Sequence, residues 1–446
     1  MDNKTIYALS TVFGKSGIAV FRISGNTAFE FFDRMTNLNS GSVESRKMYF
    51  TPILNIDSRE TLDKCLVVAF KAPNSFTGED TVEINCHGSK AVIRSIADSL
   101  AEIEGFRLAE AGEFSRRAFY NGKMDLTEAD GLADLIDAET ELQQKVALRQ
   151  MGGTLFSLYE DWRSRLISLL SHIEAYIDFP EEDIPQDTVF KLENDVFKII
   201  EEIDKHLQVN KIEERMRDGF QVVISGPTNA GKSSLINAIV RRNVAIVSDI
   251  AGTTRDVIEA YVDIKGFPVI FSDTAGLRES ENTVEKIGID LARKKINEAD
   301  FNVFLFDADN TDPSVFDEYL KDNNHFLLVA NKCDKITDER KKELMQKGCV
   351  LISAKNNINI EDITDKLYAY FNDIYSSSSA QLITRQRYRE ALKKCLENLR
   401  RFNLHKEIEL SAEDIRLACR EIGKITGRVE VDEILDKIFS SFCIGK

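Results

Sequence analysis

The sequence predicts a multidomain α/β protein with an α+β N-terminal domain, a discontinuous all-α helical domain, and an inserted domain whose sheet is mostly parallel. Strand-like and helix-like runs alternate only between residues 218 and 375, a pattern typical of parallel α/β domains. Helical periodicity dominates on both sides of that region, and 446 residues are enough for several domains. We expect domains at 1–121, 122–217, 218–376 and 377–446, where the second and fourth segments form the helical domain.

The first 121 residues have the short strand-like runs of an α+β domain. Residues 17–25, 65–70 and 81–86 are rich in apolar and β-branched side chains, and a helical pattern spans residues 89–103. Arg22 and Glu83 lie inside two of these strands. Alternation alone makes both of them solvent-facing strand positions and assigns them no chemistry.

Long helices are predicted on both sides of the inserted domain. Thr127-Glu128-Ala129-Asp130 has the form of a capping box, and Gly152-Gly153 indicates a break between helices. After a serine run at 376–379, which is typical of a linker, helical spacing resumes at 385–402 and 412–438. The simplest architecture packs two helical halves together around the inserted domain.

The second helical half contains a cluster of basic side chains with two interpretations. The cluster can bind RNA through phosphate contacts, or it can be the solvated face of a helix. Replacement by glutamate, with RNA affinity measured against salt, would distinguish the two. The cluster consists of Arg385, Arg387, Arg389, Lys393, Lys394, Arg400 and Arg401.

The inserted domain opens with a phosphate-loop motif. Residues 226–233 read G-P-T-N-A-G-K-S and fit the pattern G-x-x-x-x-G-K-[ST], between an apolar strand-like run and an amphipathic helical run. In this motif backbone N–H groups point at nucleotide phosphates, and the Lys232 ammonium neutralises the terminal phosphate oxygens. The Ser233 hydroxyl can ligate Mg²⁺.

Three further motifs follow in the order of a guanine-nucleotide switch, each after an apolar strand-like run. The aspartate of Asp273-Thr274-Ala275-Gly276 can reach Mg²⁺ through water. In Asn331-Lys332-Cys333-Asp334, the carboxylate can accept both the N1–H and the N2–H of guanine, which adenine does not offer. Ser353-Ala354-Lys355 supports the guanine side through backbone contacts. The sequence therefore predicts a GTP-binding domain of the Ras-like phosphate-loop class.

A switch loop is expected at residues 252–256, between the first helix of this domain and its next strand. Thr254 can complete Mg²⁺ coordination when a γ-phosphate is present. Arg255 is either an arginine finger or the partner of a neighbouring carboxylate. The candidate GTP-binding residues are Asn229, Ala230, Gly231, Lys232, Ser233, Ser234, Thr254, Asp273, Thr274, Ala275, Gly276, Asn331, Lys332, Asp334, Ser353, Ala354 and Lys355.

One catalytic feature of Ras-like enzymes is absent from the sequence. Leu277 stands where those enzymes place the glutamine that orients the attacking water. Catalysis must therefore use a later acid, such as Glu279, Glu281 or Glu285, or a group from a second molecule. The Asn229 oxygen can hold a monovalent cation beside the phosphate loop, or it can simply stabilise the loop.

Composition and charge exclude several classes of protein. Lys and Arg total 58 against 74 Asp and Glu, a net charge of −16, so the overall field repels nucleic acid unless basic residues cluster. The seven cysteines form no C-x-x-C pair and no secretory segment is visible, which predicts a cytoplasmic, reducing location. No long uninterrupted apolar segment is present, and we expect no stable membrane association.

Taken together, these motifs resemble the tRNA modification GTPase family called MnmE or TrmE, over essentially the whole chain. The most distinctive part is Cys443-Ile444-Gly445-Lys446, which matches the family's C-terminal Cys-x-Gly-Lys signature. Ordinary Ras-like GTPases lack that signature. Four internal segments also match in order, at 73–80, 87–88, 112–115 and 178–180.

The resemblance implies ligand residues beyond those that the motifs indicate. A formyl- or methylene-tetrahydrofolate would contact Arg22, Glu83, Lys123 and Lys446, and Cys443 would face that pocket, either for direct chemistry or for packing. In the family the GTPase domains pair across their switch regions, with Glu285 orienting water. A bound K⁺ would lie against Asn229, Ser248, Ile250 and Thr253, of which Ser248 and Thr253 are also expected at the nucleotide.

The resemblance also implies partners and a function. The N-terminal domain would make the protein a homodimer, and an FAD-dependent partner of the MnmG (GidA) type would join it in a heterotetramer or larger complex. The two would form the carboxymethylaminomethyl or aminomethyl group on the wobble uridine of certain tRNAs. The alternatives are a ribosome-assembly or RNA-binding GTPase switch without modification chemistry, and a dynamin-like membrane remodeller.

Overall fold

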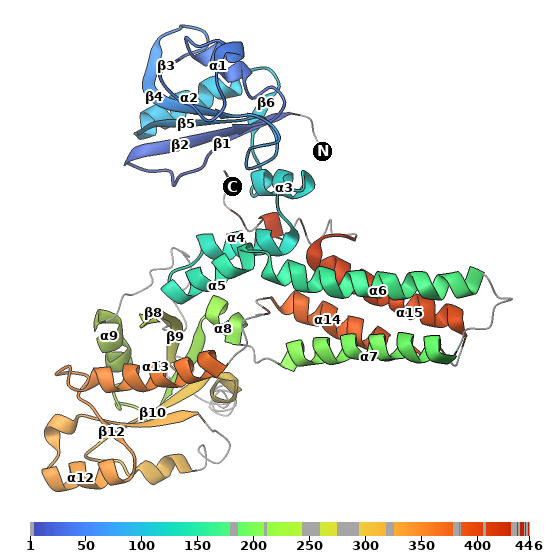
Figure 1. Cartoon of the computed structure of the whole chain (residues 1–446). Helices are drawn as coiled ribbons and strands as arrows, with labels where there is room; N and C mark the ends of the chain where they lie inside the picture. The colour runs from blue at the N-terminus through green and yellow to red at the C-terminus, as the bar shows by residue number, and fades with distance from the viewer. Residues whose placement is uncertain are drawn as a thin grey trace, which may run out of the picture. The chain divides into compact units, whose positions relative to one another are not determined.

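The computed structural model contains two β-sheets and a set of long helices (Figure 1). It describes residues 4–178, 186–208, 212–242, 259–273, 294–317, 325–377, 383, 385–404, 407–429, 435, 438–440, 442 and 445. The chain forms two compact units. One comprises Met1–Ala133, Phe156–Ile167 and Cys419–Lys446, and the other comprises Asp134–Leu155 and Ser168–Ala418.

The N-terminal part is a six-stranded sheet with the strand order β3-β4-β5-β2-β1-β6. Neighbouring strands are antiparallel, except that β1 and β6 are parallel. The sheet confirms the strands predicted in this region and adds three that the sequence did not indicate. The strands are β1 (Thr5–Leu9), β2 (Ser16–Ser24), β3 (Met48–Leu54), β4 (Thr61–Phe70), β5 (Thr81–Gly88) and β6 (Phe106–Leu108).

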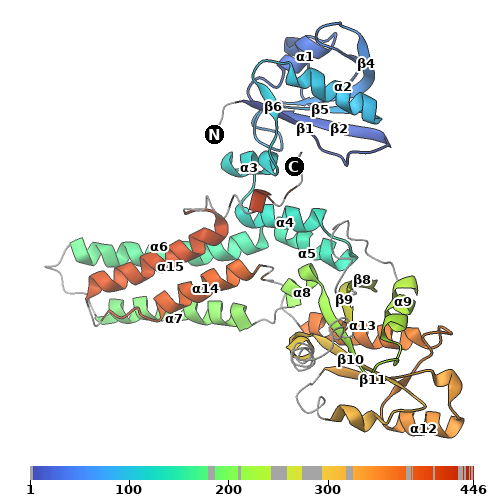
Figure 2. The same ribbon diagram turned by 180° about the vertical axis from the view of Figure 1, so that it is seen from behind.

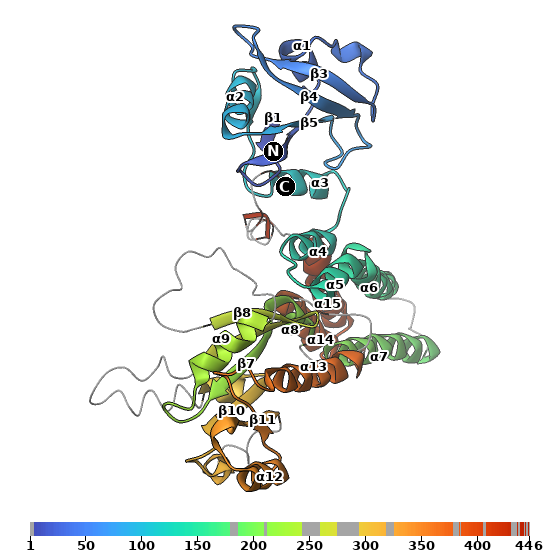
Figure 3. The ribbon, with the colours of Figure 1, turned by 90° about the vertical axis from the view of Figure 1, so that its left-hand side faces the viewer.

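The two faces of this sheet are used differently. One face carries the main core, where α1 (Glu30–Met35) and α2 (Lys90–Ala101) pack against alternate strand residues (Figure 3). The opposite face carries a smaller apolar cluster of Ile6, Ala8, Ala109 and Phe114, the last of which belongs to α3 (Glu113–Tyr120), with Phe76 packed against it. Because little apolar surface covers this second face, polar side chains can occupy it.

Helices from before and after the inserted domain lie side by side, as predicted (Figures 1 and 2). Ion pairs join them: Arg416 of α15 contacts Glu174 of α6 at 2.9 Å, and Arg400 beside α14 contacts Asp204 of α7 at 2.6 Å. Among the described residues, no helix is long and apolar enough to cross a bilayer. The helices are α4 (Leu126–Ile136), α5 (Glu141–Met151), α6 (Thr154–Asp178), α7 (Gln186–Gln208), α8 (Ile212–Asp218), α14 (Gln386–Leu399) and α15 (Ile408–Thr426).

Two predictions about helix boundaries are wrong. The N-cap of α4 is Asp125 rather than Thr127: its Oδ1 accepts hydrogen bonds from the backbone N–H groups of Thr127 and Glu128 at 2.7 and 3.0 Å. The Glu128 carboxylate in turn accepts from the Asp125 N–H at 2.9 Å, so the capping box begins two residues earlier, with aspartate in the capping role. At the other end of the chain, the predicted continuous helix is interrupted: α15 ends at Thr426 and residues 427–429 are not helical, whereas Leu435 and residues 438–440 are again helical.

The inserted domain is a second six-stranded sheet, with the order β12-β11-β10-β7-β9-β8. All neighbours are parallel except β8 and β9. The domain follows α8 and ends with α13 (Ile360–Ser377), close to the predicted region. The strands are β7 (Phe220–Ser225), β8 (Glu259–Ile264), β9 (Phe267–Asp273), β10 (Phe301–Asp307), β11 (Phe326–Asn331) and β12 (Val350–Leu351).

The strands of this domain are buried on both faces. Val222 and Ile224 of β7 face a core that includes α9 (Lys232–Arg242) and α13, whereas Val223 faces a second core with Leu344 of α12 (Asp338–Gln346). Burial on both faces explains the continuous apolar runs in the sequence. β7 lies between β9 and β10, so the loop after it opens at the point where the strand order reverses, which is the usual ligand position in such sheets.

Short 3₁₀ helices lie at Ser40–Ser42, Pro313–Phe316 and Cys333–Lys335.

The buried imidazole of His206 in α7 gives a pH-dependent prediction. Burial, with the nearby charge of Arg389, lowers the pKa of His206 to about 4. An unfolded chain has a histidine pKa of about 6.5 and binds the proton more readily. Stability from this group is therefore present above pH 6.5, and we expect about 3 kcal/mol of it to be lost as the pH falls toward 4.

His206→Gln should remove this part of the acid sensitivity. The measurement is urea unfolding, followed by circular dichroism at several pH values, for the wild type and the variant. Parallel stability profiles for the two proteins between pH 6.5 and 4 would contradict the prediction.

Candidate functional site

The phosphate loop connects β7 to α9 at the carboxyl edge of the sheet. Asn229 and Gly231 both adopt positive φ angles, +64° and +99°. A side chain at Gly231 would collide with the Asn331 side chain, so only glycine permits the close approach of these two loops. Lys232, at the start of α9, is largely buried and donates from Nζ to the carbonyl oxygens of Gly226 and Pro227 at 3.1 and 3.2 Å. Its ammonium thus lies inside the loop that the motif assigns to phosphates.

The two residues expected on the Mg²⁺ side are in contact. The Ser233 hydroxyl in the first turn of α9 donates to Oδ2 of Asp273, at the end of β9, at 3.2 Å. A hydroxyl and a carboxylate at the carboxyl edge of the sheet are the oxygen ligands and water acceptors that Mg²⁺ prefers. The structure therefore brings together two motifs that are forty residues apart.

The Asn331 side chain joins three loops of the nucleotide site. Its Nδ2 donates to the Ala230 carbonyl of the phosphate loop at 2.8 Å. Its Oδ1 accepts from the backbone N–H groups of Lys332 and Ala354 at 2.8 and 3.0 Å. Because Asn331 is almost completely buried, its main role is to hold these motifs at a fixed spacing.

Asp307 is a residue of this site that the sequence motifs did not indicate. It ends β10, and its Oδ2 accepts from Lys332 Nζ at 2.7 Å. Partial burial, the largest single effect, would raise the pKa of Asp307, but the hydrogen bonds from Lys332 and the Asp309 N–H, with the charges of Lys332 and Lys335, together lower it. The ion pair fixes the direction of the Lys332 stem. A polar residue at the end of a buried strand was the available signal.

Asp334 is the residue that the motif assigns to the guanine base. Its carboxylate is exposed, and a hydrogen bond from the Ser353 side chain is the main cause that lowers its pKa. The group is therefore ionised at neutral pH and has oxygen lone pairs available for two N–H donors. Ser353 is buried behind it, whereas Lys355 is exposed.

Many predicted switch residues lie outside the described residues. Of the GTP-binding set, the structure places residues of the phosphate loop, Asp273 and the two guanine-side motifs, with Ser234 exposed in the first turn of α9. The predicted residues outside the described part of the chain are Ser248, Ile250, Thr253, Thr254, Thr274, Ala275, Gly276, Glu285, Cys443 and Lys446.

A second candidate site lies on the less covered face of the N-terminal sheet. Arg22 of β2 is directly opposite Glu83 of β5, and Nε and Nη2 of Arg22 donate to Glu83 Oε1 at 3.1 and 2.9 Å. The Arg22 guanidinium also lies 5.0 Å from the ring centre of Phe76 and 5.7 Å from that of Phe114. Only about a quarter of each charged side chain is exposed, 20% and 26%. The interpretation of Arg22 and Glu83 as freely solvated strand residues is therefore wrong.

Two other segments reach this part of the N-terminal domain. Lys123 follows α3, and its side-chain stem lies beside Gly78 in the loop between β4 and β5, which also carries Phe76. The carbonyl oxygen of Gly445 accepts from the Ser10 hydroxyl, just after β1, at 3.0 Å. The residue next to Lys446 therefore lies against the first strand of the sheet, although the two segments are 435 positions apart.

Three arginines of the basic cluster have carboxylate partners within the helical domain. Arg385 contacts Asp134 at 2.6 Å, Arg389 contacts Glu214 at 3.3 Å, and Arg400 contacts Asp204. These pairs join helices from before and after the inserted domain. They favour a structural role for the three arginines over an RNA-binding role.

Comparison with known protein families identifies the chain. Residues 5–123 match the model of the GTP-binding protein TrmE N-terminus, and residues 126–443 match the model of the MnmE helical domain. The chain belongs to the MnmE family. The two family models together cover both candidate sites. One model covers the residues of the Arg22 site, and the other spans both helical halves with the inserted nucleotide domain.

Relatives called tRNA modification GTPase MnmE match this MnmE-family chain along its length. The protein of Rickettsia bellii strain RML369-C is 45% identical, and that of Rickettsia rickettsii strain Sheila Smith is 44% identical. In each case the match covers 99% of this chain and all of the relative. The Rickettsia typhi protein is 43% identical over the same extent.

Solved structures resemble part of the MnmE-family chain. Era in complex with MgGDPNP and a segment of 16S ribosomal RNA is 23% identical, with a TM-score of 0.28, covering 40% of this chain and 66% of Era. The G domain of the FeoB iron transporter of T. maritima is 24% identical, with a TM-score of 0.26, covering 34% of this chain and 98% of that domain.

The exposed carboxylate of Asp334 gives a prediction about base selectivity. Asp334→Asn replaces one acceptor oxygen by an N–H₂ donor that faces the donors of guanine. We expect GTP affinity to fall by about 10³–10⁴-fold, because polar groups on both sides lose their partners. Xanthosine triphosphate, which carries an acceptor at that edge, should bind the variant better than GTP does.

Nucleotide affinities of wild type and variant, measured by equilibrium titration, check this expectation. Asp338→Asn, at an exposed position in α12, is the matched control and should leave both affinities unchanged. Equal GTP binding by wild type and Asp334→Asn would contradict the assigned role.

Proposed function

We propose that this MnmE-family GTPase works with an FAD-dependent partner of the MnmG (GidA) type on tRNA. The two would form the carboxymethylaminomethyl or aminomethyl group at carbon 5 of the wobble uridine, using a folate one-carbon unit. The observation that carries the proposal is the presence, in one chain, of a guanine-type phosphate-loop domain and of the separate Arg22–Glu83 site in a TrmE-type domain.

In the nucleotide site, each chain residue would have a distinct task. Lys232 would neutralise the terminal phosphate oxygens, and Asp334 would accept from the guanine base. Ser233 and Thr254 would ligate Mg²⁺, with Asp273 acting through water. The Ser233–Asp273 hydrogen bond of 3.2 Å supports this arrangement for the described residues.

Asn229 would hold K⁺ beside the phosphate loop, together with Ser248, Ile250 and Thr253. Its side chain is exposed in the phosphate loop and is therefore accessible to a cation, which supports this role. Positive charge at that place would act as an arginine finger does, on the charge that develops in the transition state. Glu285 would orient the attacking water in place of the missing glutamine.

The Arg22 site fits a reduced pterin such as 5-formyl- or methylene-tetrahydrofolate. The Glu83 carboxylate is an acceptor for the N–H groups of an aminopyrimidine edge, and the partly exposed Phe76 ring offers flat apolar surface to a heterocycle, whereas the buried Phe114 ring packs beside Arg22. Arg22, Lys123 and Lys446 would supply positive charge for an anionic folate. The bound folate would supply the one-carbon unit. Cys443 would lie near it, two positions before Gly445.

Exposed apolar side chains support a homodimer through the N-terminal domain. Phe50 of β3 is 72% exposed and lies opposite Leu66 of β4, which is 41% exposed. Met48 of the same strand is 58% exposed. These residues alternate with core residues and lie on the sheet face that carries Arg22. A second copy that covers this patch would remove its apolar surface from water. The partner protein and tRNA would join this dimer in a heterotetramer or larger complex.

The cation role of Asn229 predicts a strong salt dependence of GTP hydrolysis. Replacing K⁺ by Na⁺ should lower GTP turnover on the order of 100-fold, because the stabilising charge would be lost from the transition state. Asn229→Ala should be slow in both salts while retaining GTP affinity. Turnover is measured at several protein concentrations, since pairing of the domains should make it concentration-dependent. Equal wild-type rates in K⁺ and Na⁺ would exclude the cation role.

The function itself is tested on tRNA. Cells that lack the protein should contain tRNA without the wobble modification, measured by nucleoside mass spectrometry. Arg22→Ala should fail to restore the modification and should weaken 5-formyl-tetrahydrofolate binding at least about tenfold, because the site loses its central cation. GTP affinity of the variant should be unchanged. Persistence of the modified uridine in the deletion cells would refute the proposed function.

A further inference from the structure

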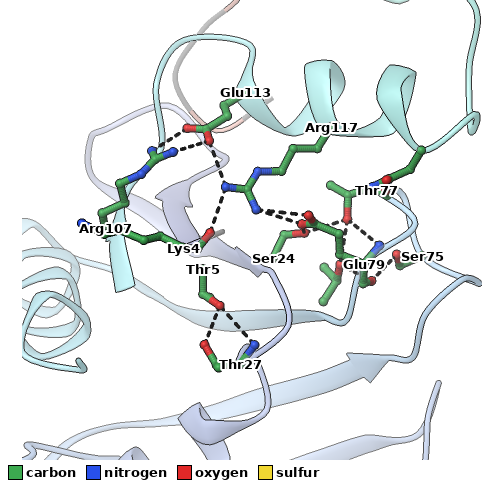
Figure 4. A network of polar contacts seen from close by, with 12 residues as sticks. Lys4, Thr5, Ser24, Thr27, Ser75, Thr77, Glu79, Arg107, Glu113 and Arg117 are labelled. Carbon is green, nitrogen blue, oxygen red and sulfur yellow. Dashed lines mark hydrogen bonds and ion pairs between the residues drawn. The ribbon is translucent and has the colours of Figure 1, made fainter. Parts of the chain in front are cut away.

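Figure 4 shows a network of polar and charged side chains in the N-terminal domain, which includes Glu79, Arg107, Glu113 and Arg117. At its centre, the Arg117 guanidinium of α3 is only 5% exposed. Its Nη1 donates to both carboxylate oxygens of Glu79, at 3.1 and 3.2 Å. Its Nη2 donates to the Lys4 carbonyl at 2.9 Å and to Glu113 Oε1 at 3.0 Å. One side chain thereby contacts the β4–β5 loop, its own helix and the chain just before β1.

The remaining contacts balance the charges of this network. Glu113 accepts from both terminal nitrogens of Arg107, at 2.7 and 2.6 Å, and Glu79 accepts from the buried Ser24 hydroxyl at 2.8 Å. Burial alone would raise the pKa of Glu113, but the hydrogen bonds from Arg107, the Glu110 N–H and Arg117 lower it. Two arginines therefore face two carboxylates, and removing one member leaves another without its ion-pair partner.

The network connects the two segments that carry the aromatic rings of the site. Phe76 belongs to the β4–β5 loop, three residues before Glu79, and Phe114 belongs to α3, three residues before Arg117. Neither segment is part of the strand ladder, so sheet hydrogen bonds do not fix the rings. Besides the Arg117–Glu79 pair, the Asn121 side chain donates to the Thr77 carbonyl at 2.7 Å and ties the end of α3 to the same loop.

We infer that Arg117 and Glu79 are positioning residues that set the spacing of the Phe76 and Phe114 rings around the Arg22–Glu83 pair. Their ion pair holds the loop against the helix, so both rings face the Arg22 guanidinium before any ligand arrives. A heterocycle that stacks on a Phe76 ring already in place loses less free energy to ordering than one whose binding must position that ring. The inference rests on the proposed folate site. It gives a positioning role to two residues that hold together the segments carrying the rings and do not contact the ligand.

Glu79→Gln in the full-length protein tests this inference. The substitution keeps the size of the side chain and removes the charge that faces Arg117. We expect the Kd for 5-formyl-tetrahydrofolate to rise on the order of tenfold, at a temperature where circular dichroism shows the variant folded. Arg117→Lys is a second variant with the same expectation, because an ammonium group cannot span Glu79, Glu113 and the Lys4 carbonyl together.

A double-mutant cycle separates positioning from plain stability. If Glu79 acts through Phe76, Glu79→Gln should have little further effect on Kd in a Phe76→Ala background. Arg107→Gln is the matched control, since it breaks an ion pair of the same network without loosening the loop from the helix. It should lower the thermal midpoint with little change in Kd. Additive effects in the cycle, or a rise in Kd for Arg107→Gln equal to that for Glu79→Gln, would overturn the inference.

Failure of the folate proposal can be distinguished from failure of the positioning inference by ligand binding to the wild type. If the wild type shows no affinity for 5-formyl-tetrahydrofolate, the proposed ligand is wrong, and a crystal structure of Glu79→Gln then decides the positioning role alone. Displacement of the Phe76 ring from its place over Arg22 would support the inference. An unmoved ring would overturn it.

Discussion

The buried amide of Asn331 is the constraint on which the nucleotide domain depends. Three loops at the carboxyl edge of the sheet meet at this side chain, which bonds to the phosphate loop, to its own motif and to the Ala354 N–H. The bonds are possible because Gly231 has no side chain at the point of closest approach. The loops assigned to the phosphates and to the base are therefore held together by hydrogen bonds of one side chain, at the carboxyl edge of the sheet.

The N-terminal sheet positions its candidate site on one of its faces rather than at an edge. Its strands bury one face under α1 and α2, whereas the other face carries a smaller apolar cluster and the Arg22–Glu83 pair. Arg22 and Glu83 can then lie opposite each other on neighbouring strands, where the sheet fixes their backbone positions and the surrounding rings partly exclude water. The chain can carry two chemically distinct sites because the candidate nucleotide site lies at the carboxyl edge of one sheet, whereas the Arg22–Glu83 pair lies on a face of the other.

The sequence predicted the elements whose periodicity is strong and the motifs whose residues are adjacent. The strand and helix around the phosphate loop, the break at Gly152-Gly153 and the two helical halves all belong to this group. Contacts set by tertiary assembly were out of reach. The Arg22–Glu83 pair spans 61 positions and the Lys332–Asp307 pair spans 25, and no local rule selects either partner. The N-cap of α4 was misplaced for a local reason, since Asp125 and Thr127 are both good capping residues two positions apart.

The docking of Gly445 on the end of β1 links the fold to the order of synthesis. Strand β1 leaves the ribosome before Gly445 does, and the contact between Ser10 at its end and Gly445 must wait until 435 more residues have been added. During that time the N-terminal sheet can form its strand ladder and its main core, but the peptide around Gly445 that packs against the end of β1 has not yet been synthesised. A translation product that ends before Gly445 would therefore carry a first sheet without this contact, so synthesis past Gly445 is itself a checkpoint for the N-terminal domain.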